Sequence, residues 1–156
     1  MIMACVTSVN YQVRVNGEET SKFTPTRGLR QGDPISPYLF LLCAEALSNL
    51  LMREEEAGNL EGVKVCRGAP SITHLLFADD SLILMKADMK NADTLRNVLF
   101  AYCNASGQLV SVEKSRIFFS PNTKVEDKAQ ICTILNIMTE PLNDKYFGLP
   151  ANVGVD

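Results

Sequence analysis

The pattern of apolar and polar positions first predicts an antiparallel ribbon near the start of the chain. Residues alternate from Tyr11 to Val15, and the stretch from Glu18 to Phe23 returns with extended character. Between these stretches lies Asn16-Gly17, the dipeptide typical of a two-residue type I′ turn, because both positions tolerate a positive φ. We therefore expect two short strands joined by a tight turn.

Apolar residues at helical spacing predict three helices. Ser36 is a good N-cap for the first, with Pro37 at its first helical position. Asp88 can cap the second, and a capping box of Thr123 and Glu126 can start the third. The residues expected on the buried stripes are Leu39, Phe40, Cys43, Ala46, Leu47, Leu50 and Leu51 in the first helix, Leu95, Val98, Leu99 and Tyr102 in the second, and Val125, Ala129, Cys132 and Leu135 in the third.

Two adjacent carboxylates, Asp79 and Asp80, lie between two apolar runs that each have the length of a buried strand. Leu75–Phe77 leads in and Leu82–Met85 leads out, which leaves residues 78–81 for a tight turn. Because like charges repel, a divalent cation held by oxygen ligands is the usual partner of such a pair. An isolated Asp-Asp in a loop is more often a solvated turn, but strands buried on both faces and central in a sheet favour a metal site here.

A polar loop precedes the first helix. The sequence TPTRGLRQGDPISP at residues 24–37 contains three prolines and two glycines, which exclude a regular element, and Arg27, Arg30, Gln31 and Asp33 are crowded into it. One interpretation is a plain charged connector. The other, which we favour because functional side chains concentrate in loops, is a shaped part of a site.

Strands and helices interleave along the chain, which predicts an α+β fold with helices on one face of an antiparallel sheet. Residues 62–66, 109–112 and 116–120 are further candidate extended segments, with Lys114 between the last two. His74 is the only histidine, and its place on an apolar strand predicts a hydrogen-bonded structural residue rather than a catalyst.

Composition limits the classes of function. With 156 residues, of which 46% are hydrophobic, the chain fits one domain with a sizeable core. A formal net charge of −3 does not provide the basic surface of a protein that binds nucleic acid by itself. The five scattered cysteines indicate neither a disulfide framework nor a zinc site. The sequence shows no signal-peptide pattern and no apolar run near the ~18 residues of a membrane span.

Taken in order, these motifs resemble the palm of reverse transcriptases from non-long-terminal-repeat (LINE-type) retrotransposons, particularly plant ones. RGLRQGDPISPYLF at residues 27–40 resembles the family's loop and helix that contact template and incoming nucleotide, and FADD at residues 77–80 resembles its metal-binding tip. SGQLVSVEKS at 106–115 and YFGLP at 146–150 resemble the segments that follow. FADD alone is a weak signal, but FADD after such a loop and helix is hard to obtain by chance.

The resemblance implies a function and the residues that carry it. It implies an RNA-directed DNA polymerase that uses Mg²⁺ or Mn²⁺ in two-metal nucleotidyl transfer, with an RNA template, a DNA primer and dNTP as partners. Asp79 and Asp80 would be catalytic and hold the metal. Lys114 would act near the leaving pyrophosphate, with an ordinary surface lysine as the equal alternative. The implied substrate-binding residues are Arg30, Gln31, Gly32 and Phe77.

The resemblance also implies an incomplete domain. The family's palm is a ferredoxin-like split βαβ sheet with helices on one face, so residues 1–156 are expected to form one partial domain that runs toward the thumb. The family's third metal-binding carboxylate, in an FDxxxAYD-like segment, has no counterpart in this sequence, which predicts that the chain alone will not polymerise DNA. The alternative is a catalytically inactive remnant that acts at most as an interaction module. An intracellular location, nuclear or cytoplasmic, follows from the family.

Overall fold

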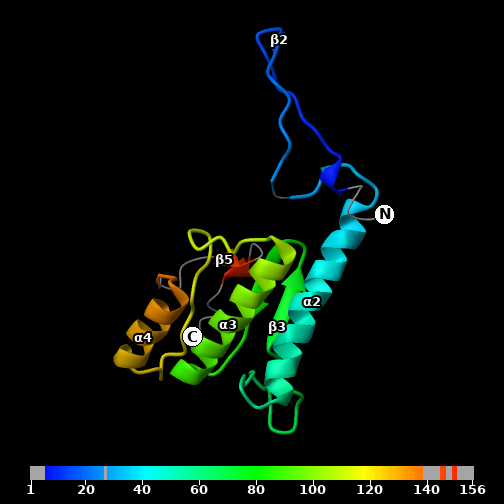
Figure 1. Ribbon diagram of the computed structural model, residues 1–156. Helices are drawn as coiled ribbons and strands as arrows, with labels where there is room; N and C mark the ends of the chain where they lie inside the picture. The colour runs from blue at the N-terminus through cyan, green and yellow to red at the C-terminus, as the bar shows by residue number, and fades with distance from the viewer. Residues whose placement is uncertain (1–5, 27, 139–144, 147–148, 151–156) are drawn as a thin grey trace.

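The computed structural model describes the whole chain except residues 1–5, 27, 139–144, 147–148 and 151–156. The described helices, α2, α3 and α4, lie side by side, and the β3–β4 hairpin runs along α2 (Figure 1). Among these residues, no helix is both long and apolar enough to cross a membrane. The helix bounds are Ser36–Glu56 for α2, Met89–Ser106 for α3 and Val125–Leu135 for α4. The strands are β1 (Arg14–Val15), β2 (Glu18–Glu19), β3 (His74–Phe77), β4 (Asp80–Ile83), β5 (Lys145–Tyr146) and β6 (Leu149–Pro150).

The mixed α and β composition is as predicted, but the single sheet is not. Within the described residues the strands form three separate antiparallel pairs, β1–β2, β3–β4 and β5–β6. One face of β3–β4 packs on the core through Leu76 and Ile83, whereas Leu75 and Phe77 on the other face are 53% and 66% exposed. The prediction that this hairpin is central and buried on both faces is therefore wrong for the described residues, because helices cover only one of its faces and no third strand pairs with it there.

The core lies between α2, α3 and the inner face of the hairpin. It is built from Leu47 and Leu51 of α2, Leu60 after that helix, and Leu95, Val98 and Tyr102 of α3. These are the positions that helical spacing predicts for the second half of α2 and for α3. The first half of α2 projects beyond the core (Figure 1), and there Tyr38, Leu41 and Leu42 are all more than 60% exposed. Ala46, predicted to be buried, is exposed as well.

Two helix starts differ from the prediction. Ile35, not Ser36, is the N-cap of α2, and the Ser36 hydroxyl instead donates to the carbonyl oxygen of Arg30 at 2.9 Å. Lys124 is the N-cap of α4 and no side chain caps that helix, so the capping box of Thr123 and Glu126 does not form. At α2 the Ser36 hydroxyl is thus used by the preceding loop and does not cap the helix.

The predicted buried face of α4 is right for Leu135, and Cys132 is half-buried, but it is wrong for the first half of the helix. Val125 is 79% exposed and Ala129 is exposed, whereas Ile131 is completely buried and Leu135 packs on the core. Because apolar residues lie on several sides of this short helix, their spacing alone does not fix which side faces α3.

Other local predictions are confirmed. Asn16 and Gly17 have φ values of +52° and +91°, as a type I′ turn requires. Asp88 caps α3 by accepting a hydrogen bond from the backbone N–H of Asn91 at 2.9 Å. His74 is structural: its ring nitrogens hydrogen-bond with the hydroxyls of Ser48 and Thr73 at 2.8 and 2.9 Å.

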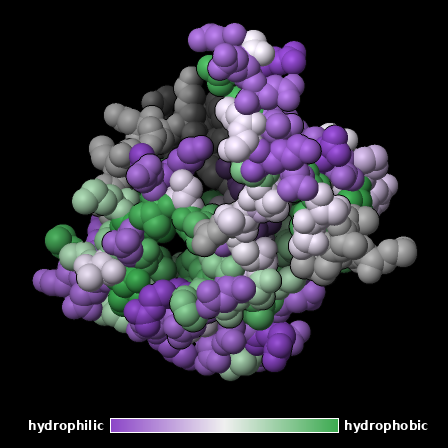
Figure 2. Space-filling model, turned by 45° about the horizontal axis from the view of Figure 1, so that its top comes forward, coloured by the Kyte–Doolittle hydropathy of each residue, from purple (hydrophilic) through white to green (hydrophobic). Residues whose placement is uncertain are grey.

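The additional extended segments are only partly present. Val63 forms an isolated antiparallel bridge with Ile72, so residues 62–66 contribute one pair instead of a strand. Residues 109–112 and 116–120 belong to none of the strands β1–β6. A turn spans residues 112–114. Figure 2 shows hydrophilic side chains along the β1–β2 ribbon and a group of hydrophobic side chains below it, at the left of the view.

Candidate functional site

The acidic turn is tighter than predicted. Phe77 pairs with Asp80 across the turn, so only Ala78 and Asp79 connect the two strands. Asp80 opens β4, and Ser81, expected in the turn, pairs with Leu76 within the strands. Both carboxylates are exposed at the end of the hairpin. The structure therefore places the two acids side by side at the hairpin tip, Asp79 in the turn and Asp80 as the first residue of β4.

Nothing in the described part of the chain neutralises these acids. Neither Asp79 nor Asp80 forms an ion pair there. No group of three or more His, Cys, Asp and Glu side chains that could hold a metal ion is found among the described residues. Adjacent carboxylates are the hard oxygen ligands that Mg²⁺ accepts, so the pair fits part of a coordination shell but does not complete one.

Ala78 adopts a backbone conformation that alanine disfavours, with φ at +50°. A left-handed conformation costs an L-residue roughly 1–2 kcal/mol, whereas glycine adopts it freely. We expect Ala78→Gly to raise the free energy of unfolding by up to about 1 kcal/mol in urea titrations, after the entropy cost of glycine is included. Ala101→Gly, on the exposed side of α3, should lower it by about 1 kcal/mol. A loss of stability in both variants would contradict the assigned turn.

The polar loop before α2 is held by its own hydrogen bonds. The Arg30 carbonyl oxygen accepts from the backbone N–H of Asp33 at 3.3 Å, and the Asp33 carboxylate accepts from the N–H of Ile35 at 3.1 Å. Gly32 has a φ of +81°, and a Cβ placed there would meet nothing within 4 Å. Asp33 is thus a structural residue of the loop, and Gln31 and Gly32 lie at its exposed turn.

The predicted site residues come from three separate segments. In Figure 1, β3 points along α2 toward the end where α2 begins, so the hairpin tip and the loop of Gln31 and Gly32 lie toward the same end of that helix. Lys114 is exposed in the turn after α3, where its N–H donates to Ser111. Within the described residues, no hydrogen bond or ion pair joins the side chains of Arg30, Gln31 or Lys114 to either carboxylate. Their approach to the tip stays a prediction.

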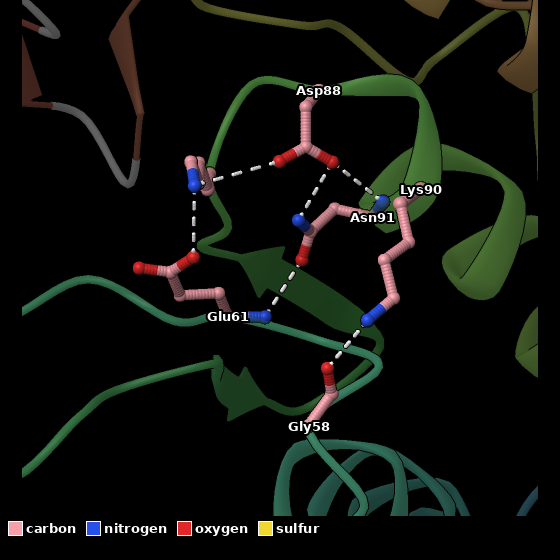
Figure 3. A network of polar contacts seen from close by, with 6 residues as sticks. Gly58, Glu61, Asp88, Lys90 and Asn91 are labelled. Atoms are coloured by element: carbon pink, nitrogen blue, oxygen red, sulfur yellow. Dashed lines mark hydrogen bonds and ion pairs between the residues drawn. The ribbon is translucent and has the colours of Figure 1, made fainter.

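A buried asparagine beneath the hairpin was not predicted from the sequence. Asn91, which is 3% exposed, accepts a hydrogen bond from the backbone N–H of Glu61 and donates to the carboxylate of Asp88 (Figure 3). An asparagine in the first turn of a helix carries no signal of burial, because this residue is common and usually solvated there. Only the packing of three chain segments around it reveals its role.

Comparison with known proteins gives a family for most of the chain. Residues 1–149 match the model described as reverse transcriptase (RNA-dependent DNA polymerase). The chain is 57% identical over 67 residues to an uncharacterized mitochondrial protein of Arabidopsis thaliana, a match that covers 43% of this chain and 55% of that protein. No solved structure matches.

A further relative is a retrovirus-related Pol polyprotein from a type-1 retrotransposable element of Popillia japonica. It is 31% identical over 113 residues, which are 72% of this chain and 18% of that protein. A second Pol polyprotein of the same description and organism is 37% identical over 82 residues, covering 53% of this chain and 11% of its own length. The chain thus spans about half the length of the Arabidopsis relative and under a fifth of the Pol polyproteins.

Proposed function

Since the chain belongs to the reverse transcriptase (RNA-dependent DNA polymerase) family, we propose that it forms the palm part of the RNA-directed DNA polymerase of a non-long-terminal-repeat retrotransposon. The observation that carries this proposal is the family match over residues 1–149 together with two adjacent, exposed carboxylates at the tip of a hairpin. Residues 1–156 act as one partial domain in this proposal. The nuclear or cytoplasmic location stays a prediction.

In the proposed site, Asp79 and Asp80 provide carboxylate oxygens to Mg²⁺ or Mn²⁺. When bound in a polymerase, such ions activate the primer 3′-hydroxyl and hold the triphosphate of the incoming nucleotide. The exposed position of both acids and the absence of ion-pair partners among the described residues support this role. The exposed Leu75 and Phe77, and strand edges that pair with no other strand among the described residues, are compatible with a larger ferredoxin-like palm sheet built around this hairpin.

We assign substrate contacts to the residues around the acids. Gly32 allows close approach of a nucleotide, because it is exposed and has no side chain, and the neighbouring Gln31 amide offers donors and an acceptor. Arg30 supplies a fixed positive charge for phosphates, and the exposed ring of Phe77 lies across the strands from Asp80. Lys114 is proposed as the cation near the leaving pyrophosphate. The template RNA, primer DNA and dNTP are the partners in this proposal.

A Mn²⁺ titration followed by electron paramagnetic resonance tests the metal site. We expect the chain to bind Mn²⁺. The double variant Asp79→Asn/Asp80→Asn should weaken the Mn²⁺ affinity about tenfold or more, which is the usual effect of losing interactions at a metal site. The matched control is Glu55→Gln/Glu56→Gln, which removes an equal charge from another adjacent acid pair, at the end of α2. Equal weakening by both double variants would mean that Mn²⁺ only senses net charge, and the proposal would fail.

A further inference from the structure

The β3–β4 hairpin is held at its base by the segment that follows α2. We call this base the hairpin root and define it as residues 61–63, 72–73 and 84–86. Here Val63 and Ile72 exchange backbone hydrogen bonds of 2.9 Å, on the β3 side of the hairpin. On the β4 side, the N–H of Lys86 donates to the carbonyl oxygen of Glu61, also at 2.9 Å. The segment 61–63 therefore anchors both strands.

Asn91 connects this root to the start of α3. Its side-chain oxygen accepts the N–H of Glu61 at 2.6 Å, and its side-chain nitrogen donates to Asp88 Oδ1 at 2.8 Å. The same Asp88 oxygen accepts the backbone N–H of Asn91, so one carboxylate both caps α3 and orients the amide (Figure 3). Every polar atom of the buried Asn91 amide group thus has a role in joining α3 to the root.

The charges around the amide strengthen this connection. Lys86 Nζ lies 3.1 Å from Glu61 Oε2 and 3.9 Å from Asp88 Oδ2. Partial burial of Asp88 favours its neutral form, but the hydrogen bonds from Asn91 and the nearby Lys86 and Lys90 outweigh this effect and lower the pKa of the carboxyl. Asp88 is therefore ionised when it accepts from Asn91, and charge-assisted hydrogen bonds of this kind are stronger than neutral ones.

The root is important because the hairpin has little other support. A two-stranded hairpin alone is marginally stable in water, and here Leu76 and Ile83 hold its inner face against the core, while the root holds the end of both strands that is remote from the acids. Mg²⁺ and Mn²⁺ require fixed ligand positions, and the two acids lie at the far end of this hairpin from its root. The order of the tip then depends on how firmly the root is held.

We infer that Asn91 is a positioning residue for the Asp79–Asp80 tip, acting through the hairpin root. This inference rests on the proposed function, because it assigns a role toward the metal site of that proposal. Asn91 touches neither the metal nor the substrate in this assignment. It fixes the segment 61–63 against α3, and this segment fixes both strands that carry the acids.

The test compares the 156-residue chain with Asn91→Ala and with Asn97→Ala, a matched control at an exposed position of α3. Two quantities are measured: the Mn²⁺ affinity, and the hydrogen exchange of the β3 and β4 backbone amides without metal. We expect Asn91→Ala to weaken Mn²⁺ binding about tenfold, the lower range for outer contacts of metal sites, and to speed exchange in both strands. Asn97→Ala should change neither. A folded Asn91→Ala chain with unchanged affinity and exchange overturns the inference.

If Asn91→Ala does not fold, the test is made by exchanging the side chains of Asn91 and Asp88, which are hydrogen-bonded to each other. Asn91→Asp places two carboxylates within hydrogen-bond distance and should weaken Mn²⁺ binding and speed exchange in the same way. Adding Asp88→Asn should restore both, because the amide at position 88 can then donate to the carboxylate at position 91, which still accepts from Glu61, and asparagine caps a helix as well as aspartate does. Failure of this rescue overturns the inference.

The same measurements separate the inference from the proposed function. If Asp79→Asn/Asp80→Asn does not weaken Mn²⁺ binding, the proposed metal site is wrong, and hydrogen exchange alone then decides whether Asn91 holds the hairpin. If the acid variants weaken Mn²⁺ binding but the Asn91 variants do not, the metal site stands and the positioning role is wrong.

Discussion

Grafted into an active reverse transcriptase of the family in place of its corresponding residues, this chain should support primer extension on an RNA template, and Asp79→Ala/Asp80→Ala should abolish it. The expected loss is about 10³-fold or more, because metal ions contribute several kcal/mol to stabilising the transition state and each 1.36 kcal/mol is a factor of ten in rate. Asp79 lies in the two-residue turn and Asp80 is the first residue of β4. Replacing both side chains therefore leaves the rest of the hairpin intact. Primer extension with Mg²⁺ and with Mn²⁺ measures the effect.

Two comparisons make this result specific. Glu55→Gln/Glu56→Gln in the same graft should extend the primer normally, because these acids lie at the end of α2 that is remote from the tip along the helix. The isolated 156-residue chain should not extend the primer, because a two-metal site needs more ligands than the two carboxylates of the hairpin tip. The opposite result would be that the isolated chain extends the primer and that the acid variants abolish this extension. This result would show that a third carboxylate is dispensable or is supplied from within this chain.

Several local features of the fold could be predicted from the sequence because neighbouring residues fix them, although the starts of α2 and α4 could not. Asn16-Gly17 accepts positive φ at both positions, and Asp88 marks the start of α3 because its carboxylate accepts a hydrogen bond from a free backbone N–H of the first turn. The two adjacent acids between two apolar runs likewise predict a hairpin tip, and the structure has one there. In each case the residues that form the feature are neighbours in the sequence.

The surroundings of these elements could not be predicted in the same way. Leu75 and Phe77 have the composition of a buried strand, but whether a second layer covers them depends on segments that their own pattern does not describe. The rotation of α4 is set by the burial of Ile131 against the rest of the core, not by the first apolar residue of the helix. The role of Asn91 depends on Glu61, thirty positions away, and no local pattern connects them.

The candidate site follows the same division. The positions of Asp79, Asp80 and the shaped loop could be read from the sequence, whereas Arg30, Gln31, Phe77 and Lys114 acquire a role only if segments distant in the chain converge on a nucleotide. The structure adds that Asp33, which is close to Arg30 and Gln31 in sequence, stabilises the loop itself. A charged residue in a loop of this kind can therefore stabilise the backbone of the loop itself.

The two halves of α2 should respond very differently to the same substitution. Leu51 is completely buried in the core between α2 and α3, whereas Leu41, in the first half of the same helix, is 62% exposed. We expect Leu51→Ala to lower the free energy of unfolding by about 3 kcal/mol, because it removes buried methyl groups and leaves a cavity. Leu41→Ala should change it by less than about 0.5 kcal/mol, since alanine also favours helix and little contact is lost.

Urea unfolding followed by circular dichroism measures both values on the same helix and the same leucine-to-alanine change, so helix propensity cancels between the two variants. Similar losses from both would mean that the first half of α2 is packed in solution, and that the surface of Tyr38, Leu41 and Leu42 is covered by another part of the assembly or by a second chain. A large loss from Leu51→Ala alone places the stability of the chain in the helix pair that supports the acidic hairpin. In that case the exposed first half of α2 can be altered without unfolding the domain, and its leucines become available for testing the contacts proposed with template and primer.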